Sequence, residues 1–523
     1  MSQTLVIRGG TLIDVSGGKS LQNSVIVIEG DRFHQIGQGQ MVSVPPGAEV
    51  IEAPGKWIIP GLIDSHVHYR DWMPELFLAF GVTSVKDLGN PTEWILAQRE
   101  GVTRGKIVGP RIFASGSLLI ARGARSHHIP VSSPEEARRE TKKLIECGVD
   151  VIKVHLGVTA DMIRAVAEEA HRAGLRVTGH IDLSARDAVL AGLDGVEHAT
   201  GIDRATIRDP LRVQKLAQFS TLIEKFIGPG HLMEPRYFDE LIQIFVERGT
   251  YVGPNLITLW GAVVEHRRQH EYEDFHLLRQ PGLDYIPEDR RRYWLDNYNA
   301  VYGATAKYSF EDLRQGFIQH RDFIGQLARA GGKVVAESDT GAVVPGIGLH
   351  RELELLVEAG MTPMQALQSA TTVAAEFLQK EKDLGSIAPG KLADLVVLGL
   401  NPLESISNTQ KIDRVIQGGR VLDHGFHREF TNPIPRPSHE EFYGNPLPQI
   451  EKLSPVIATE EDPETEITLR GTSFQRESVA RLDGVGLHTE FLSPTELRAI
   501  IPARLLRRVG TFPVTVTNPK PEG

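Results

Sequence analysis

The chain has 523 residues, of which 41% are hydrophobic and 24% are charged. That length exceeds one ordinary core, so we expect two or three domains of a soluble globular protein. The 57 Lys and Arg residues against 67 Asp and Glu residues give a formal net charge of −10, which argues against a nucleic-acid-binding surface. The single cysteine, Cys147, excludes an internal disulfide and a Cys-rich zinc site.

The sequence also contains no run of 18 or more apolar residues, so we expect no membrane span. Residues 1–6 enter strand-like sequence directly, without the basic and apolar segments of a signal peptide. We therefore expect a cytoplasmic protein, although Met1 also fits a chain from which a signal has been removed.

Residues 1–60 predict a small β unit, because from residue 4 on Val, Ile and Thr alternate with polar residues between Gly-rich turns. Beyond residue 60, short apolar segments alternate with amphipathic helical ones. We expect strands at 61–68, 81–89, 111–117, 149–156, 175–181, 195–200, 250–256 and 332–339. Eight strands alternating with helices predict a (β/α)8 TIM barrel over residues 61–383, and a doubly wound open sheet is the alternative.

Two segments of this region stand out between the strands. Ser133 is expected to cap a helix that begins at Pro134 and ends before Gly148. The long stretch 257–331 predicts extra helices, which form either a lid at the mouth of the barrel or a peripheral insertion.

The remaining chain returns to β structure. Residues 384–428 are strand-like and are expected to complete the β unit of residues 1–60 as one small β-sandwich. The Pro-rich segment 429–450 reads as a linker, and 451–523 predicts a short all-β sandwich.

Polar residues at the expected carboxyl ends of the barrel strands carry the chemical signal, since side chains converge there on one site. His66 and His68 are two residues apart, so on a strand both face the same side and can reach one metal. His180 and His198 end two later strands, and Asp339 ends the last one, where it can bind metal and move a proton. A helix N-cap is the plainer role for Asp339.

Lys153 lies in an otherwise apolar strand, where a buried ammonium is costly. It either snorkels to solvent or pairs with an acid, or it reacts with carbon dioxide to give a carbamate that can bridge two metals. His155 shares its strand face and is a rival ligand. Glu337 shares a face with Asp339 and is expected to be no ligand.

The chain resembles the amidohydrolase superfamily, and more narrowly its imidazolonepropionase-related and prolidase-like branch. The resemblance covers about residues 4–425 and is carried by PGLIDSHVH, GVTSVKDLG, GVDVIKVHL, LRVTGHID, GVEHATG, AESDTG, the helical run HRELELLVEAGMTPMQALQSATTVAAEFL and the closing DLGSIAPGKLADLVVLGLNP. Two departures concern substrate preference: Asp182 stands where many relatives have a second His, and Glu337-Ser338 precede Asp339 where relatives have Gly-Thr.

The resemblance implies two divalent metal ions, which we expect to be zinc. His66, His68 and Asp339 would bind the more buried ion, and His180 and His198 the second. Lys153, as N6-carboxylysine, would bridge the two ions. A metal-bridging hydroxide would then attack the scissile carbonyl, with Asp339 passing its proton to the leaving nitrogen.

Substrate contacts are expected in the loop after the third strand and on the seventh strand. Relatives place a His in a Gly-rich loop at this point, and Arg residues beside it can grip a carboxylate. An exposed polar loop is the alternative. The expected contacts are Arg122, Arg125, His127, His128 and Tyr251.

The last segment, 451–523, resembles an IPT/TIG domain of immunoglobulin-like fold on ITLRGTSF and FPVTVTNPKPEG. Such domains continue with another strand after the Asn-Pro turn, so we expect an incomplete sandwich or an edge filled by another segment.

We expect a hydrolase that cleaves the amide bond of a small molecule: a dipeptide, an N-acyl amino acid, a urea or carbamate, or an aryl amide. A cyclic-amide hydrolase or a deaminase of the same superfamily is the first alternative, and Lys153 argues against a deaminase. The alternative of another class is an inactive barrel with a binding TIG-like module. A homo-oligomer is expected.

Overall fold

The computed structural model describes residues 4–121, 128–219, 228–258, 266–288, 290–295, 308–340, 343–436, 448–459, 462–475, 478–483, 485–507 and 510–518. The chain divides into two compact units, Met1–Ile434 and Pro435–Gly523. None of the helices within the described ranges is both long enough and apolar enough to cross a membrane.

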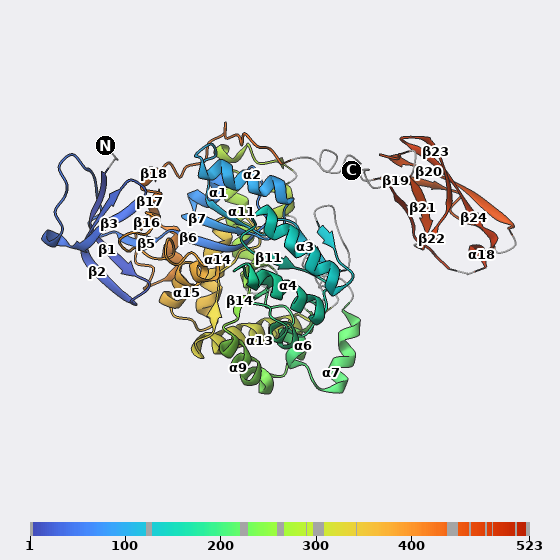
Figure 1. Cartoon of the computed structure of the whole chain (residues 1–523), viewed down its shortest axis with the longest axis horizontal. Helices are drawn as coiled ribbons and strands as arrows, with labels where there is room; N and C mark the ends of the chain where they lie inside the picture. Colours follow the sequence, from blue (N-terminus) through green and yellow to red (C-terminus); the bar gives the residue numbers. More distant parts are fainter. Residues whose placement is uncertain are drawn as a thin grey trace. The chain divides into compact units, whose positions relative to one another are not determined.

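One sheet of the first unit joins strands from both ends of that unit (Figure 1). Its order is β18-β17-β16-β5-β1-β2-β3, with β4 paired to β1. The pairing of β5 with β16 runs from Trp57 opposite Leu398 to Pro60 opposite Leu395. The strands are β1 (Thr4–Asp14), β2 (Lys19–Glu29), β3 (Arg32–Gln38), β4 (Glu49–Glu52), β5 (Trp57–Pro60), β16 (Leu395–Leu398), β17 (Ile412–Gln417) and β18 (Arg420–Leu422).

All eight segments expected between 61 and 339 contain a strand of the parallel region. They are β6 (Leu62–Val67), β7 (Val82–Asp87), β8 (Arg111–Ala114), β11 (Ile152–Val154), β12 (Val177–Gly179), β13 (Gly195–Glu197), β14 (Tyr251–Gly253) and β15 (Lys333–Val334). Two short strands, β9 (Leu118–Ile120) and β10 (His128–Pro130), were not expected.

The expected mixed α/β architecture is confirmed, but the parallel strands do not form one closed ladder. In the described residues, β6-β7-β8 make one sheet and β10-β9-β11-β12-β13-β14-β15 make another. Isolated backbone hydrogen bonds connect segments of the two sheets: Ser65 N donates to Ala336 O at 3.0 Å, and Asp150 N donates to Ala114 O at 2.8 Å.

Helices lie between these strands in sequence, as the apolar periodicity indicates. The predicted helix after Ser133 is confirmed: the Ser133 hydroxyl accepts from Glu136 N, and Gly148 ends the helix at φ 82°. The helices are α1 (Pro74–Ala79), α2 (Thr92–Thr103), α3 (Pro134–Cys147), α4 (Ala160–Arg172), α5 (Ala185–Leu190), α6 (Ile202–Thr206), α7 (Pro210–Lys215), α9 (Phe238–Arg248), α11 (Arg267–Leu277), α13 (Phe310–Arg329), α14 (Ile347–Glu358), α15 (Pro363–Ser369) and α16 (Thr372–Phe377).

The long stretch between β14 and β15 contains the expected extra helices α11 and α13. The Arg351 guanidinium on α14 is 1% exposed and ties α11 down, with its Nη1 2.8 Å from Asp274 Oδ1 and its Nη2 2.9 Å from Glu273 Oε2. These ion pairs hold α11 against α14.

The second unit is all-β, in two sheets ordered β19-β20-β24-β23 and β22-β21-β25. Apolar side chains between them, among them Ile467, Leu469 and Leu497, form a core of their own. The strands are β19 (Gln449–Ser454), β20 (Glu464–Thr472), β21 (Val479–Leu482), β22 (Val485–Gly486), β23 (His488–Ser493), β24 (Glu496–Pro502) and β25 (Val514–Thr517), with the short helix α18 (Ala503–Leu506).

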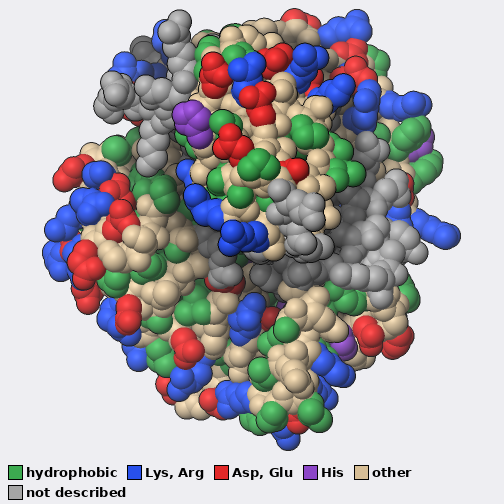
Figure 2. Space-filling model, turned by 90° about the vertical axis from the view of Figure 1, so that its right-hand side faces the viewer, with side chains coloured by type: hydrophobic (Ala, Val, Ile, Leu, Met, Phe, Trp, Pro, Cys, Tyr) green, Lys and Arg blue, Asp and Glu red, His purple; other side chains and the backbone are tan. Residues whose placement is uncertain are grey.

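The surface carries charges of both signs. On the face shown in Figure 2, Lys and Arg side chains are interspersed with Asp and Glu side chains and form no single basic surface.

Candidate metal centre

The six residues predicted as metal ligands lie on a parallel strand or in the segment that follows one. His66 is on β6 and Lys153 is the central residue of β11. The others follow strand ends: His68 follows β6, His180 follows β12, His198 follows β13, and Asp339 follows β15. Because the carboxyl ends of parallel strands share one edge, these side chains converge there.

A chain of imidazole rings runs across this edge. Ring centroids lie 5.3 Å apart for His68 and His66, 4.6 Å for His66 and His198, and 5.0 Å for His198 and His180. The ring of His155 lies 4.3 Å from that of His180. The four predicted His ligands are therefore neighbours, and the rival His155 extends the same row.

Two groups of three ligand atoms are compact enough to hold an ion. One nitrogen or oxygen from each of His66, His68 and Asp339 lies within 4.8 Å of the others, and the same holds for His66, His198 and Glu337. In the first group, His68 Nε2 and Asp339 Oδ1 are 3.4 Å apart.

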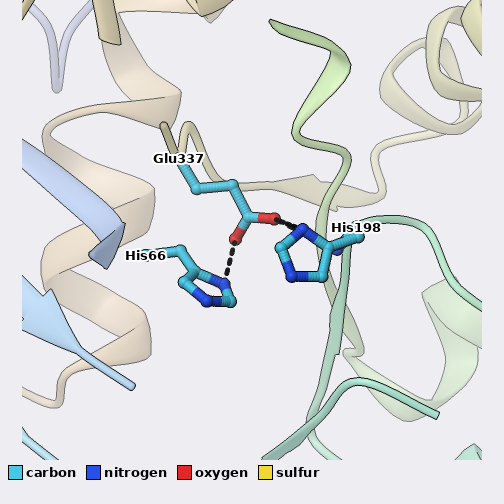
Figure 3. A group of neighbouring side chains, drawn as sticks. All are labelled: His66, His198 and Glu337. Atoms are coloured by element: carbon cyan, nitrogen blue, oxygen red, sulfur yellow. Dashed lines mark hydrogen bonds and ion pairs between the residues drawn. The ribbon is translucent and has the colours of Figure 1, made fainter. Parts of the chain in front are cut away.

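Glu337, which we expected to be no ligand, lies between two of the imidazoles (Figure 3). Its Oε2 is 3.8 Å from His66 Nδ1, and its Oε1 is 3.9 Å from His198 Nδ1 and accepts the His198 backbone N–H at 3.1 Å. Burial and the neighbouring Glu197 raise the pKa of Glu337 well above its usual value. Burial and the Glu197 carboxylate thus both disfavour the charged form of Glu337.

Glu197 sets the tautomer of His66. Its Oε2 lies 2.7 Å from His66 Nδ1, and its Oε1 accepts from Lys86 Nζ at 3.0 Å and from the Thr178 hydroxyl. Burial alone would raise the pKa of Glu197, but the Lys86 ammonium, with Lys153 and His66, holds it well below its usual value. A carboxylate only accepts, so Nδ1 of His66 carries the hydrogen and Nε2 keeps its lone pair.

The surroundings disfavour protonation of the candidate nitrogen ligands. Burial, followed by the charge of Lys153, lowers the pKa of His66 well below its usual value, and burial likewise lowers the pKa values of His180 and His198. Burial lowers the pKa of Lys153 to about 8. Neutral imidazole is the form that coordinates metals.

Backbone strain gathers at the same strand ends. His198 has φ 56° and Asp339 has φ 48°, both in the left-handed region that side chains other than Gly rarely adopt. Asp339 N donates to His66 O at 2.9 Å, which ties the last strand end to the first. Strain of this kind marks sites where the surrounding fold fixes a side chain's direction.

The donor set fits a divalent metal such as zinc, since imidazole nitrogen and carboxylate oxygen are its usual ligands in proteins. Two buried atoms support this fit: neither His66 Nε2 nor Lys153 Nζ has a hydrogen-bond partner in the part of the chain that the structure describes. Buried polar atoms are normally satisfied, so a bound group is the simplest partner for them.

Of the predicted substrate contacts that the structure describes, His128 and Tyr251, only His128 lies beside the imidazole row. The ring of His128 lies 6.1 Å from that of His155, at the end of the imidazole row. Tyr251 starts β14, with its ring 5.1 Å from Phe377 and its hydroxyl accepting from Lys333 Nζ at 3.2 Å, so it is not brought together with the histidines. Arg122, Arg125 and His127 lie outside the described residues.

Sequence reasoning missed Glu197 and Lys86, which form a buried ion pair behind the ligands. Each of these two residues is a charged residue within a buried strand, which is the pattern that singled out Lys153. The same pattern would have indicated both of them.

A model of the amidohydrolase family matches residues 57–422. The chain belongs to the amidohydrolase family. Among its sequence relatives in this family, an adenine deaminase of Mesorhizobium japonicum is 23% identical over 395 residues, which cover 75% of this chain and 53% of that protein. An imidazolonepropionase of Pseudomonas aeruginosa is 25% identical over 405 residues, covering 73% of this chain and 89% of that protein. The chain thus spans about half the length of the adenine deaminase.

Solved structures show the same fold. A candidate prolidase from Bifidobacterium longum superposes with a TM-score of 0.62 at 24% identity, over 83% of this chain and 98% of that one. The expected superfamily, with imidazolonepropionase and prolidase-like neighbours, is confirmed.

Proposed function

We propose that this amidohydrolase is a metal-dependent enzyme that hydrolyses a C–N bond of a small amide. Dipeptides, N-acyl amino acids, ureas or carbamates, and aryl amides are the candidate substrates. Two compact groups of candidate ligand atoms support the proposal, His66 with His68 and Asp339 and His66 with His198 and Glu337, together with the imidazole row that continues from His198 to His180. The proposed ligands are His66, His68, Lys153, His180, His198 and Asp339.

Two divalent ions, zinc in our proposal, would be held by this set. His66, His68 and Asp339 would hold the first. His180 and His198 would hold the second, and Lys153, as a carboxylate, would join the two. When bound, such ions polarise a carbonyl group and lower the pKa of water to about 7.

Lys153 has the chemistry that carboxylation needs. Burial lowers the pKa of Lys153 to about 8, which favours the neutral amine more than in an exposed lysine. The neutral nitrogen adds to the carbon of carbon dioxide and releases one proton, giving an N-carboxylate with a charge of −1. The buried cation, which is costly, is thereby replaced by a ligand for two cations.

Asp339 is the proposed proton carrier. Its side chain is 17% exposed and its Oδ1 lies 3.4 Å from His68 Nε2, so it reaches both the ligands and an entering substrate. Its carboxylate accepts a proton from the attacking water and donates it to the leaving nitrogen. Glu197 keeps His66 oriented throughout, since its hydrogen bond fixes the ring.

Metal analysis combined with Lys153→Ala tests the proposal. The wild-type chain should contain about two divalent ions and hydrolyse at least one member of a panel of dipeptides, N-acyl amino acids and aryl ureas. Lys153→Ala should lose bound metal and activity together. Lys333→Ala is the matched control, because Lys333 pairs with Glu376 at 2.7 Å away from the histidines. Full metal content in Lys153→Ala would contradict the bridging role.

A deaminase is the second candidate function, favoured by the match to adenine deaminases; the one from Paracoccus denitrificans is 38% identical over 429 residues, covering 80% of this chain and 57% of that protein. The buried Lys153 speaks against it, as a single metal needs no bridge. Ammonia release from adenine, without hydrolysis of the amide panel, would establish this candidate instead.

Three structural points belong to the same proposal. We infer that the two parallel sheets are parts of one (β/α)8 barrel, since backbone hydrogen bonds join β6 to the segment after β15 and β8 to the segment before β11. We infer an immunoglobulin-like fold of the IPT/TIG type for the second unit, supported by its two packed antiparallel sheets. A homo-oligomer in the cytoplasm remains our prediction.

A further inference from the structure

A small cavity lies beside His68, one of the proposed ligands of the first metal ion. His68 and Thr340, the residue after Asp339, both line it, and the Thr340 hydroxyl accepts the His68 backbone N–H at 3.0 Å. The cavity has a volume of about 20 Å³. One water molecule needs roughly 10–15 Å³, so this space suits a small polar group and excludes a bulky side chain.

Two arginines line the same cavity. Arg70 comes from the segment after β6, and Arg290 comes from the long stretch between α11 and α13. None of the described residues that line the cavity is acidic. A recess lined by charges of one sign attracts groups of the opposite sign. The cavity therefore suits an anionic group of a bound molecule.

The Arg70 guanidinium is held in place by uncharged acceptors. Its Nη1 donates to Tyr69 O at 2.7 Å, to Asn90 Oδ1 at 3.1 Å and to His68 O at 3.3 Å. The buried Asp87 interacts electrostatically with Arg70, but its Oδ1 accepts from Tyr69 N at 2.9 Å and from Asn90 Nδ2 at 2.7 Å. Arg70 is thus a fixed cation at the wall of the cavity.

Two indole rings complete the wall and direct Arg290 to it. Trp72 and Trp294 line the cavity, with ring centroids 5.4 Å apart in an edge-to-face arrangement. Trp294 is 2% exposed and packs in an apolar cluster with Leu283 and Ile286. Residues 290–295 are helical, and residues four apart on a helix share one face. The anchored Trp294 therefore holds Arg290 on the side of the cavity.

We infer that this cavity binds a carboxylate of the substrate and that Arg290 is a specificity residue for it. The inference rests on the proposed function and narrows its substrate class to amides with a carboxylate next to the scissile bond, which are N-acyl amino acids and dipeptides. A guanidinium matches a carboxylate in both charge and hydrogen-bond geometry. The ureas, carbamates and aryl amides of the panel lack this group.

The place of the cavity beside a proposed metal ligand fits such a substrate. In an N-acyl amino acid the carboxylate carbon lies two bonds, or about 2.5 Å, from the amide nitrogen. His68 lines the cavity, and its Nε2 is 3.4 Å from Asp339 Oδ1, the group proposed to protonate the leaving nitrogen. A link of two bonds between carboxylate and nitrogen matches this short separation.

The test is Arg290→Gln, assayed on two compounds with the same acyl group and side chain. One is the N-acyl amino acid of the panel that the wild type cleaves best, and the other is the N-acylamino alcohol with a hydroxymethyl group in place of the carboxylate. Each compound is characterised by kcat and KM, or by an inhibition constant where it is not cleaved. Arg292→Gln is the matched control, because Arg292 lies in the same helical stretch but has a side chain that is 68% exposed and pairs with Glu288 at 2.7 Å.

We expect the wild type to prefer the acid over the alcohol roughly tenfold or more in kcat/KM, since the alcohol lacks the charge-assisted hydrogen bonds. In Arg290→Gln, KM for the acid should rise roughly tenfold with kcat little changed, whereas the values for the alcohol should change by less than about threefold. Arg290→Lys keeps the charge and should recover part of the loss. Metal content and melting temperature should match the wild type in all variants, and Arg292→Gln should match it throughout.

A wild type that treats acid and alcohol alike, or that cleaves only ureas and aryl amides, would overturn the inference and leave the proposed function standing. The same holds for an unchanged KM for the acid in Arg290→Gln, for equal losses on both compounds, and for the same loss in Arg292→Gln. If the wild type cleaves no member of the panel, the proposed function fails and this inference fails with it.

Discussion

Replacing Lys86 by Met should destabilise the chain strongly, because it leaves the Glu197 carboxylate buried without its cation. Lys86 Nζ and Glu197 Oε1 are 3.0 Å apart, and the two side chains are 1% and 2% exposed. Removing one partner of a buried ion pair costs about 3–5 kcal/mol of unfolding free energy. Glu197 keeps its bonds to His66 and Thr178, so we expect the lower end, about 3 kcal/mol.

The measurement is guanidinium-induced unfolding of metal-free protein, for the wild type, Lys86→Met, Glu197→Gln and the double variant. The double variant should be more stable than the sum of the single losses predicts, because it leaves neither charge unpaired. Arg8→Met is the matched control: Arg8 pairs with Glu52 at 2.5 Å, but both side chains are about half exposed, so its midpoint should hardly move. A coupling between Lys86 and Glu197 below about 0.5 kcal/mol would refute the reasoning.

Two further changes give distinct readouts. Gly253→Ala places a Cβ 2.0 Å from Glu337 Oε2, so it should lower the free energy of unfolding by about 1–3 kcal/mol and reduce the metal content. The control Gly399→Ala, whose new Cβ has its nearest contact at 3.6 Å, should change neither quantity. Wild-type metal content and stability in Gly253→Ala would contradict the geometry. His350 is buried, with its pKa lowered by burial to about 4, so its contribution to stability is present above pH 6.5 and is lost as the pH falls from 6.5 to 4. In His350→Gln the free energy of unfolding should fall by roughly 3 kcal/mol less between pH 6.5 and pH 4 than in the wild type. The measurement is the free energy of unfolding of both proteins across this pH range, and parallel pH profiles would contradict the prediction.

The strand pattern was predictable because each parallel strand is a short apolar run bounded by turn residues, and all eight expected segments contain strands. The hydrogen-bonded register between neighbouring strands was not predictable. In β6 the register against β7 shifts between Asp64 and Val67, so strict two-residue alternation does not hold across His66. Such irregularities depend on tertiary packing, which residue spacing does not encode.

Within the site, residue spacing indicated the candidate ligands but not the buried charged residues around them. A single histidine at a strand end is more often a satisfied core residue, and it was the combination of four of them at strand ends that indicated a metal site. Lys86 and Glu197 lie on β7 and β13, more than a hundred residues apart, and their pairing depends on both strands facing inward. Glu337 was assigned no role, yet it contacts His66 and His198 because Gly253 leaves room for its carboxylate.

The most direct measurement is anomalous X-ray diffraction at the zinc edge from crystals of the zinc-loaded protein. We predict two peaks at the strand-end edge, one bound by His66, His68 and Asp339 and one by His180 and His198, with the side chain of Lys153 extended as a carboxylate between them. A peak elsewhere with these residues unliganded, or two ions with Lys153 unmodified, would contradict the proposed centre.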